Sequence, residues 1–146
     1  MPVVYKMDDE RRLRSWRLSG VVDPRDVLRR IAAASDDPNF QPDYDVLVIF
    51  EDGTELHGLT IETLAEIRAA AIQARQAREG NLTRKAAMIC PDQMAQLVGR
   101  LYHAGGSSDP NFLLEYRICT NAKDAGKWLS RDLSDLEMPR YALVGT

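Results

Sequence analysis

Residues 44–50 read Tyr-Asp-Val-Leu-Val-Ile-Phe, and this short stretch decides the fold class. From Val46 to Phe50 the run is continuously apolar and rich in β-branched residues. A strand without polar alternation is typical of the centre of a parallel sheet, where both faces are covered. The sequence therefore predicts a central strand over 44–50.

On the N-terminal side, residues 3–5 and 13–19 predict a β-hairpin around a polar turn at 8–10. In the second strand Trp16 and Leu18 share one face, because side chains alternate along a strand. A helix is then expected to begin at Asp23-Pro24 and to end within 35–38, where a proline cannot continue it.

On the C-terminal side, Thr60 is expected to cap a helix that ends at Gly80, with Ile61 among its inward residues and Arg75 on its solvated face. Three more elements precede the last helix. They are a strand over 85–90, a helix from Pro91-Asp92 that carries Met94, Leu97, Val98, Leu101 and Tyr102 on one stripe, and a strand over 112–119.

The last helix is expected after Asn121, which would cap it, and the tail over 131–146 cannot be assigned. The resulting order is β-β-α-β-α-β-α-β-α. It predicts a single α/β domain over 1–146, with one sheet of about five strands, mainly parallel, and helices packed on that sheet. The N-terminal hairpin would place an antiparallel strand at one edge.

Composition excludes several function classes. The 146 residues carry a net charge of −3, which argues against a nucleic-acid binder. No apolar run is long enough for a membrane span, the first residues do not resemble a signal peptide, and two cysteines are too few for a disulfide framework. We therefore expect a cytoplasmic protein. The arginines at 11, 12, 14 and 17 stand beside acids at 8–10 and are expected to form a solvated hairpin surface.

Several short strings resemble the SpoIIAA-like family of the STAS fold, which is linked to the CRAL–TRIO lipid-transfer fold. The resemblance covers most of residues 3–130 and implies a fold more firmly than a function. STAS-type anti-sigma-factor antagonists carry a phosphorylatable serine at the start of the second helix, and that signature is absent from Glu55–Ile61. Only Thr60 offers a hydroxyl there, so Thr60 is the phosphoacceptor candidate. The matching strings are residues 18–21, 23–24, 46–50, 84–89 and 121–129.

A possible ligand or partner edge lies where the parallel strands end, because loops and helix N-termini converge there. Cys90 could be a thiolate near a helix N-terminus, although a buried structural cysteine is the simpler interpretation. His57, Cys90 and Cys119 could in principle bind zinc, but their spacing matches no metal signature. Asp92 and Asn121 belong to the same edge. No metal site and no cofactor are therefore predicted.

The glycine string at 105–108 and the nearby His103 both have simple structural interpretations. The string Gly105-Gly106-Ser107-Ser108 follows a helix and precedes a strand, which indicates a helix end rather than a phosphate loop. His103, near that helix end, is expected to be solvated.

No nucleophile, base and orienting group stand together in the sequence, so no catalytic residue is predicted. The leading expectation is a non-enzymatic binding or regulatory module that acts through a protein partner or through self-association. The alternative is a carrier of a small apolar ligand or lipid, for which a chain of this length leaves little volume. An unrecognised enzyme is the third candidate.

Overall fold

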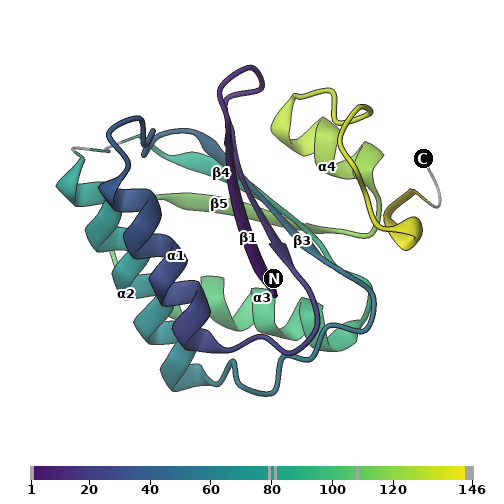
Figure 1. Ribbon diagram of the computed structural model, residues 1–146, viewed down its shortest axis with the longest axis horizontal. Helices are drawn as coiled ribbons and strands as arrows, with labels where there is room; N and C mark the ends of the chain where they lie inside the picture. Colours follow the sequence, from purple (N-terminus) through teal and green to yellow (C-terminus); the bar gives the residue numbers. More distant parts are fainter. Residues whose placement is uncertain (1, 79, 81, 108, 144–146) are drawn as a thin grey trace.

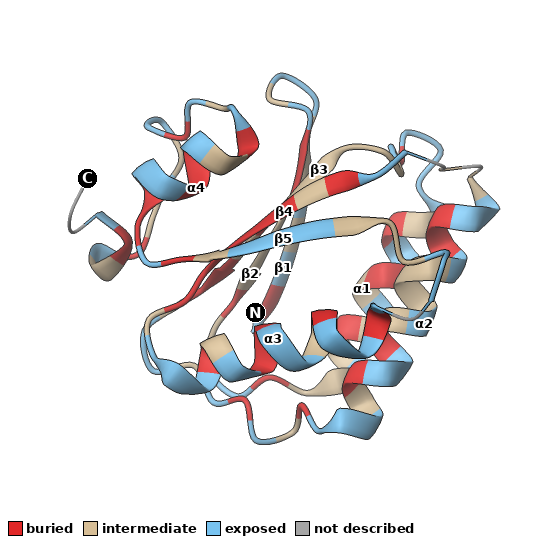
Figure 2. Ribbon diagram, turned by 180° about the vertical axis from the view of Figure 1, so that it is seen from behind, coloured by how far each residue is buried: buried red, intermediate tan, exposed pale blue. Residues whose placement is uncertain are grey.

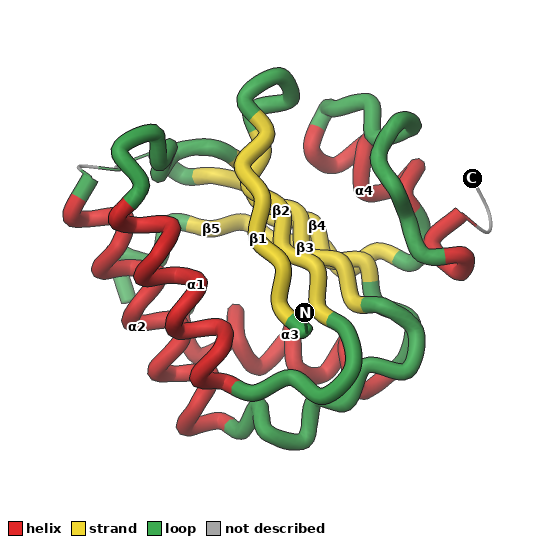
Figure 3. Tube along the Cα trace, viewed as in Figure 1, coloured by secondary structure: helices red, strands yellow, loops and turns green. Residues whose placement is uncertain are grey.

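A computed structural model describes residues 2–78, 80, 82–107 and 109–143. One five-stranded sheet forms the middle layer, with strand order β1-β2-β3-β4-β5 (Figures 1 and 3). β1 is antiparallel to β2, and the remaining neighbours are parallel. The elements are β1 Val3–Asp8, β2 Leu13–Leu18, α1 Pro24–Asp36, β3 Asp45–Phe50, α2 Ile61–Ala77, β4 Arg84–Ile89, α3 Gln93–Gly106, β5 Leu114–Cys119, α4 Ala122–Leu129 and a short 3-10 helix, Arg140–Leu143.

The fold class predicted from the sequence is confirmed, including the antiparallel edge strand. Each α-helix begins after a cap residue whose side chain accepts a backbone N–H: Asp23 from Arg25, Thr60 from Thr63, Asp92 from Ala95 and Asn121 from Asp124. These caps satisfy donors that a helix start otherwise leaves free.

The two faces of the sheet are covered by different parts of the chain. Helices α1, α2 and α3 cover one face, which we call the helix face, because three right-handed crossovers run in the same direction along the sheet (Figure 1). Helix α4 and residues 130–143 cover the other, which we call the tail face (Figures 1 and 2). The tail that the sequence left unassigned therefore completes a core, through Leu133 and Ala142.

The two faces hold separate apolar clusters. Trp16, Val48 and Met88 are neighbours on the helix face, while Leu47 and Ala87 are neighbours on the tail face. Figure 2 shows that β4 is buried along most of its length, whereas β5, at the sheet edge, is largely exposed.

Some predicted helix faces are wrong. Ile61 is exposed at the start of α2, whereas Arg75, expected in solvent, is only 3 % exposed. The stripe predicted on α3 divides, because Val98 is buried but Met94 and its neighbours Leu97 and Leu101 face outward. Small residues, Ala95 and Gly99, take the inward positions. Close packing against the sheet therefore selects small side chains that an apolar pattern does not highlight.

The glycine string lies at a helix end, as expected, but its two glycines belong to the helix rather than following it. Gly105 and Gly106 are the last residues of α3, Ser107 is its C-cap, and Ser108 lies outside the described residues. A Cβ on Gly106 would collide with the Phe112 ring, so this glycine permits a close approach of the ring to the helix.

Candidate functional site

A cavity of about 160 Å³ lies between the helix face of the sheet and α1–α3. Its sheet wall includes Trp16, Val48 and Met88, and its helix wall includes Leu64 and Val98. An apolar cavity of ~150 Å³ can hold benzene. This helix-face cavity therefore has room for a small ligand, though not for a long-chain lipid.

Two arginines give the helix-face cavity a polar end. Arg14 lies near the start of β2 and Arg84 begins β4, so both stand at the edge where the parallel strands start. Both share the face of Val46 and Ala86, since Arg14 pairs with Val46 and Val46 with Ala86. Each is 8 % exposed. The interpretation of Arg14 as part of a solvated hairpin surface is wrong.

Arg14 has no anionic partner. Its guanidinium lies 5.2 Å from the centre of the Phe40 ring, a cation–π contact. No hydrogen bond or ion pair joins the Arg14 side chain to any residue that the structure describes, and its buried Nε is without a partner. The pKa of Arg14 is lowered by burial, which disfavours the charged form.

Arg84 is held almost as weakly. Its Nη1 lies 3.5 Å from the Leu113 carbonyl, the outer limit of a hydrogen bond, and its buried Nε has no partner among the described residues. Burial lowers its pKa to about 9, and repulsion by Arg14 and Arg75 contributes. A buried, unpaired ion costs several kcal/mol of stability.

The nearby acid is already engaged. Asp43 accepts from Arg75 Nη2 at 3.0 Å and from the backbone N–H of Leu82 at 3.2 Å. Arg75 also donates to the Leu82 carbonyl. Because Asp43 is paired with Arg75, no carboxylate among the described residues is left to pair with Arg14 or Arg84.

His103 also lines the helix-face cavity and is 6 % exposed, so the expectation that it is solvated is wrong. Its Nδ1 contacts the Gly99 carbonyl at 2.8 Å, and its ring stacks on Tyr116 with centroids 3.9 Å apart. Burial lowers the pKa of His103 to about 4, so the ring is neutral near pH 7. Its Nε2 is buried and has no partner among the described residues.

The unpartnered polar atoms are concentrated at this cavity. Across the described part of the chain, five buried side-chain N or O atoms lack a hydrogen-bond partner. Four of these belong to side chains that line the helix-face cavity: Tyr5, Arg14, Arg84 and His103. Buried polar groups in native proteins are almost always paired, so each orphan requires an explanation.

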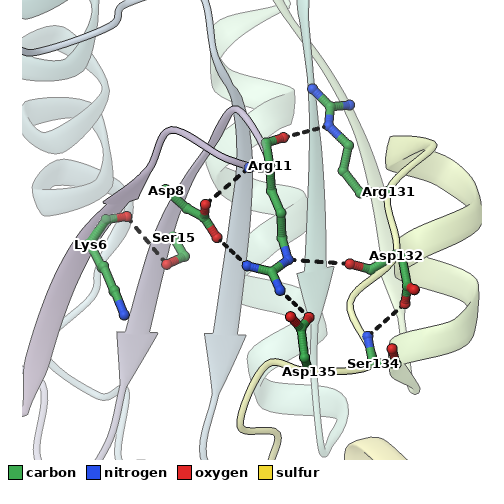
Figure 4. A network of polar contacts seen from close by, with 8 residues as sticks. All are labelled: Lys6, Asp8, Arg11, Ser15, Arg131, Asp132, Ser134 and Asp135. Carbon is green, nitrogen blue, oxygen red and sulfur yellow. Dashed lines mark hydrogen bonds and ion pairs between the residues drawn. The ribbon is translucent and has the colours of Figure 1, made fainter.

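A second arginine group, on the opposite side of the sheet, is fully paired (Figure 4). Arg11 bonds to Asp8 and Asp135, and Arg131 donates to the Arg11 carbonyl at 2.8 Å and to Asp45 at 2.8 Å. Arg17, on the tail face of β2, pairs with Glu51 at 2.5 Å. These arginines join the hairpin and sheet to the tail.

The residues predicted at the carboxyl edge of the strands do not form one site. His57 is exposed, while Cys90 and Cys119 are buried in the clusters of opposite faces. Burial raises the pKa of Cys90 to about 12, so its thiol is not activated. Asp92, Asn121 and Thr60 act as helix caps. The described residues contain no group of three His, Cys, Asp or Glu side chains that could hold a metal ion.

Strand order explains why no crevice is expected at the carboxyl edge of the strands. A crevice at the carboxyl edge arises where strand order reverses, and the parallel strands β2 to β5 follow one another without reversal. The Tyr141 hydroxyl also donates toward the Phe50 and Ile89 carbonyls, at the ends of β3 and β4. The tail therefore covers part of that edge.

One signal for the missed residues was present in the sequence. Arg14 has the same parity as Trp16 and Leu18, the two residues that were assigned to a buried face. Arg84 likewise has the parity of Ala86 and Met88. Strict alternation would have placed Arg14 inside, whereas the acids at 8–10 suggested solvent, and Arg84 lay just before the strand predicted over 85–90.

None of the helices in the described part of the chain combines the length and apolar character that crossing a membrane requires. No protein-family model matches the sequence, and searches among curated proteins and among solved structures found no match. The likeness to the SpoIIAA-like family therefore stays a prediction from short strings, and the geometry of the cavity carries the functional argument.

Proposed function

We propose that this protein is a non-enzymatic binding module whose ligand occupies the helix-face cavity. The observation that carries the proposal is an apolar cavity of about 160 Å³ lined by four side chains that each have a buried polar atom without a partner among the described residues. Pockets for small molecules combine apolar walls with a few convergent polar groups. Of the functions expected from the sequence, the small-ligand alternative has this support.

Binding rather than catalysis is favoured by the state of the thiols. Burial raises the pKa of both Cys90 and Cys119, so neither is prepared as a nucleophile. Reduced, unpaired cysteines also suit the cytoplasm, which we propose as the location.

The test uses two neutral probes, toluene and 1-octanol, added to methyl-labelled protein and followed by NMR. Methyl groups of Val48, Leu64 and Val98 should shift, because they line the cavity, while those of Leu47 and Leu129 on the tail face should not. The Ala86→Leu variant fills the cavity and should abolish the shifts. Shifts confined to the tail face, or none at all, would contradict the proposal.

A second measurement identifies what the protein carries. The purified protein is extracted with organic solvent and the extract is analysed by mass spectrometry. A small molecule recovered from the wild type but not from Ala86→Leu would support the proposal. Recovery of equal amounts from both proteins would count against it.

Self-association is the second candidate, favoured by one observation. Met94, Leu97 and Leu101 are 55 %, 44 % and 36 % exposed and lie on one stripe of α3. A second copy of the chain could cover the same stripe through two-fold symmetry. Sedimentation should then show a dimer in the wild type and a monomer in Leu97→Glu, and a monomeric wild type would exclude this candidate.

A further inference from the structure

One end of the helix-face cavity is charged and its walls are apolar, and this arrangement limits which class of ligand can bind. The inference drawn from it rests on the proposed function. Its walls are apolar, and its end at the starts of β2 and β4 carries Arg14 and Arg84. A neutral apolar ligand would fill the walls but would leave both guanidinium groups without partners. The two unpaired positive charges therefore favour a ligand that carries an anionic group at one end.

We infer that the ligand is a small carboxylate, with an apolar chain or ring of about six to eight carbons in the cavity and its carboxylate on Arg14 and Arg84. Both arginines are more than nine-tenths buried, and each has an Nε without a partner among the described residues. A planar carboxylate offers two oxygens, which matches the parallel N–H donors of a guanidinium.

The charges around this end favour a monoanion. Asp43, the carboxylate that contacts the arginine group among the described residues, is held by Arg75 and the Leu82 backbone. Helices α1, α2 and α3 all end at this edge of the sheet, so their negative dipole ends face the same region. These dipole ends oppose a doubly charged phosphate more strongly than a carboxylate.

The packing of Arg14 indicates a receiving group rather than a structural bridge. Its guanidinium lies over Phe40, and it bonds to no described backbone carbonyl. Structural arginines elsewhere in the chain do bond to carbonyls, as Arg78 does to Ser35 and Asp37 at 2.8 and 2.6 Å. The hydrogen-bonding capacity of Arg14 is therefore still available.

The experiment compares octanoate with 1-octanol, which share an eight-carbon chain and differ in the headgroup. On the wild type at pH 7, calorimetry should show that octanoate binds roughly 10- to 100-fold more tightly, as expected for charge-assisted hydrogen bonds. Octanoate should also shift the side-chain Nε–H signals of Arg14 and Arg84 in the NMR spectrum, a response that a purely structural role would not give.

Variants then assign the preference to the two arginines. In Arg14→Met and in Arg84→Met the preference for octanoate should fall at least about fivefold, with 1-octanol binding within about twofold of wild type. The matched control is Arg17→Met, on the same strand but on the tail face and paired with Glu51, which should keep the full preference. The wild-type comparison needs no variant, so it stands even if one fails to fold.

The outcomes separate this inference from the proposed function. Binding of 1-octanol without preference for octanoate overturns the carboxylate assignment and leaves the cavity-binding proposal intact. Binding of neither compound overturns both. A preference that survives in both methionine variants, or tighter binding of octyl phosphate than of octanoate, also overturns the assignment to a monoanion on Arg14 and Arg84.

Discussion

Arginines on the two faces of the sheet differ in whether they pair with a carboxylate. On the hairpin and tail side, Arg11, Arg17 and Arg131 each meet a carboxylate, and together they join segments that are far apart in sequence. Figure 4 shows the contacts of Arg11 with Asp8 and Asp135. On the helix face, Arg14 and Arg84 are more deeply buried and meet no carboxylate in the described part of the chain. An unpaired charge costs more free energy when it is buried than when it is exposed. The difference therefore supports the inference that Arg14 and Arg84 pair with a charge on a bound ligand.

The largest expected contrast comes from an acid placed on each face of β3. Leu47→Asp puts a carboxylate among Ile49, Ala87 and Leu129 in the fully buried tail-face core, and should unfold the protein, at a cost above about 4 kcal/mol. Val46→Asp places the acid beside Arg14, its neighbour in register, and should cost less than half as much.

Urea unfolding followed by circular dichroism measures both variants. A normally folded Leu47→Asp would contradict the assignment of β3 as a central, buried strand. Equal losses for the two variants would show that Arg14 cannot provide a counter-charge, which would weaken the comparison of the faces.

Acid should destabilise the helix face through His103. Its pKa is about 4 in the folded protein and about 6.5 when unfolded, so below pH 6.5 the unfolded chain binds the extra proton. Stability should therefore fall as pH drops from about 6.5 to 4, by at most about 3 kcal/mol from this group.

Urea unfolding at several pH values, compared with His103→Asn, isolates this contribution. The variant should show a smaller loss across the same window, while His57→Asn, which changes an exposed histidine, should behave as wild type. Identical pH profiles for His103→Asn and wild type would contradict a buried, neutral His103.

Added volume should have opposite effects on two adjacent residues of β4. Ala86 faces the helix-face cavity, and Ala87 faces the packed tail-face core. Ala87→Leu should overpack that core and cost about 1–3 kcal/mol. Ala86→Leu should be neutral or should stabilise by up to about 1 kcal/mol, because it fills space. Thermal unfolding measures both, and a larger loss for Ala86→Leu would argue against the cavity.

The smallest effect concerns the opposite edge of the sheet. Thr60 caps α2 by accepting the Thr63 backbone N–H at 3.2 Å. Thr60→Ala should cost about 1 kcal/mol, while Thr60→Ser and Thr60→Asp should retain the cap and the stability. Sedimentation of Thr60→Asp tests the phosphoacceptor hypothesis, since an altered oligomeric state in a folded variant would support it. An unchanged state in all three variants would leave Thr60 as a cap.

The arrangement of elements was predictable because local signals agreed with one another. Proline, cap residues and apolar runs marked each helix and strand, and the β-α alternation then fixed a parallel sheet. The assignment of residues to helix faces was less reliable. On α3, Ala95 and Gly99 pack inward, and a Cβ added at Gly99 would lie 2.9 Å from the end of the Met88 side chain, so larger side chains there would crowd the sheet.

The candidate site was harder to predict, because it consists of charges in places where charges are rarely found. Arg75 and His103 lie near helix ends, where basic residues are ordinarily solvated and stabilise the dipole. Arg14 stands beside acids that explain it as surface. Arg14 and Arg84 line one cavity because β2 and β4 flank the same strand, β3, in the folded sheet. No local sequence pattern encodes this arrangement.

Helix α4 and the tail follow all five strands in the sequence. This order has a consequence for synthesis on the ribosome. By the time Asn121 is added, the chain already contains all five strands and α1–α3, and therefore every residue of the helix face. The apolar side chains of the opposite face, such as Leu47 and Ile89, await residues 122–143. At about 5–20 residues per second, translation leaves them uncovered for roughly 1–4 s. During that interval the apolar side chains of the tail face lack the helix and tail residues that cover them in the finished fold.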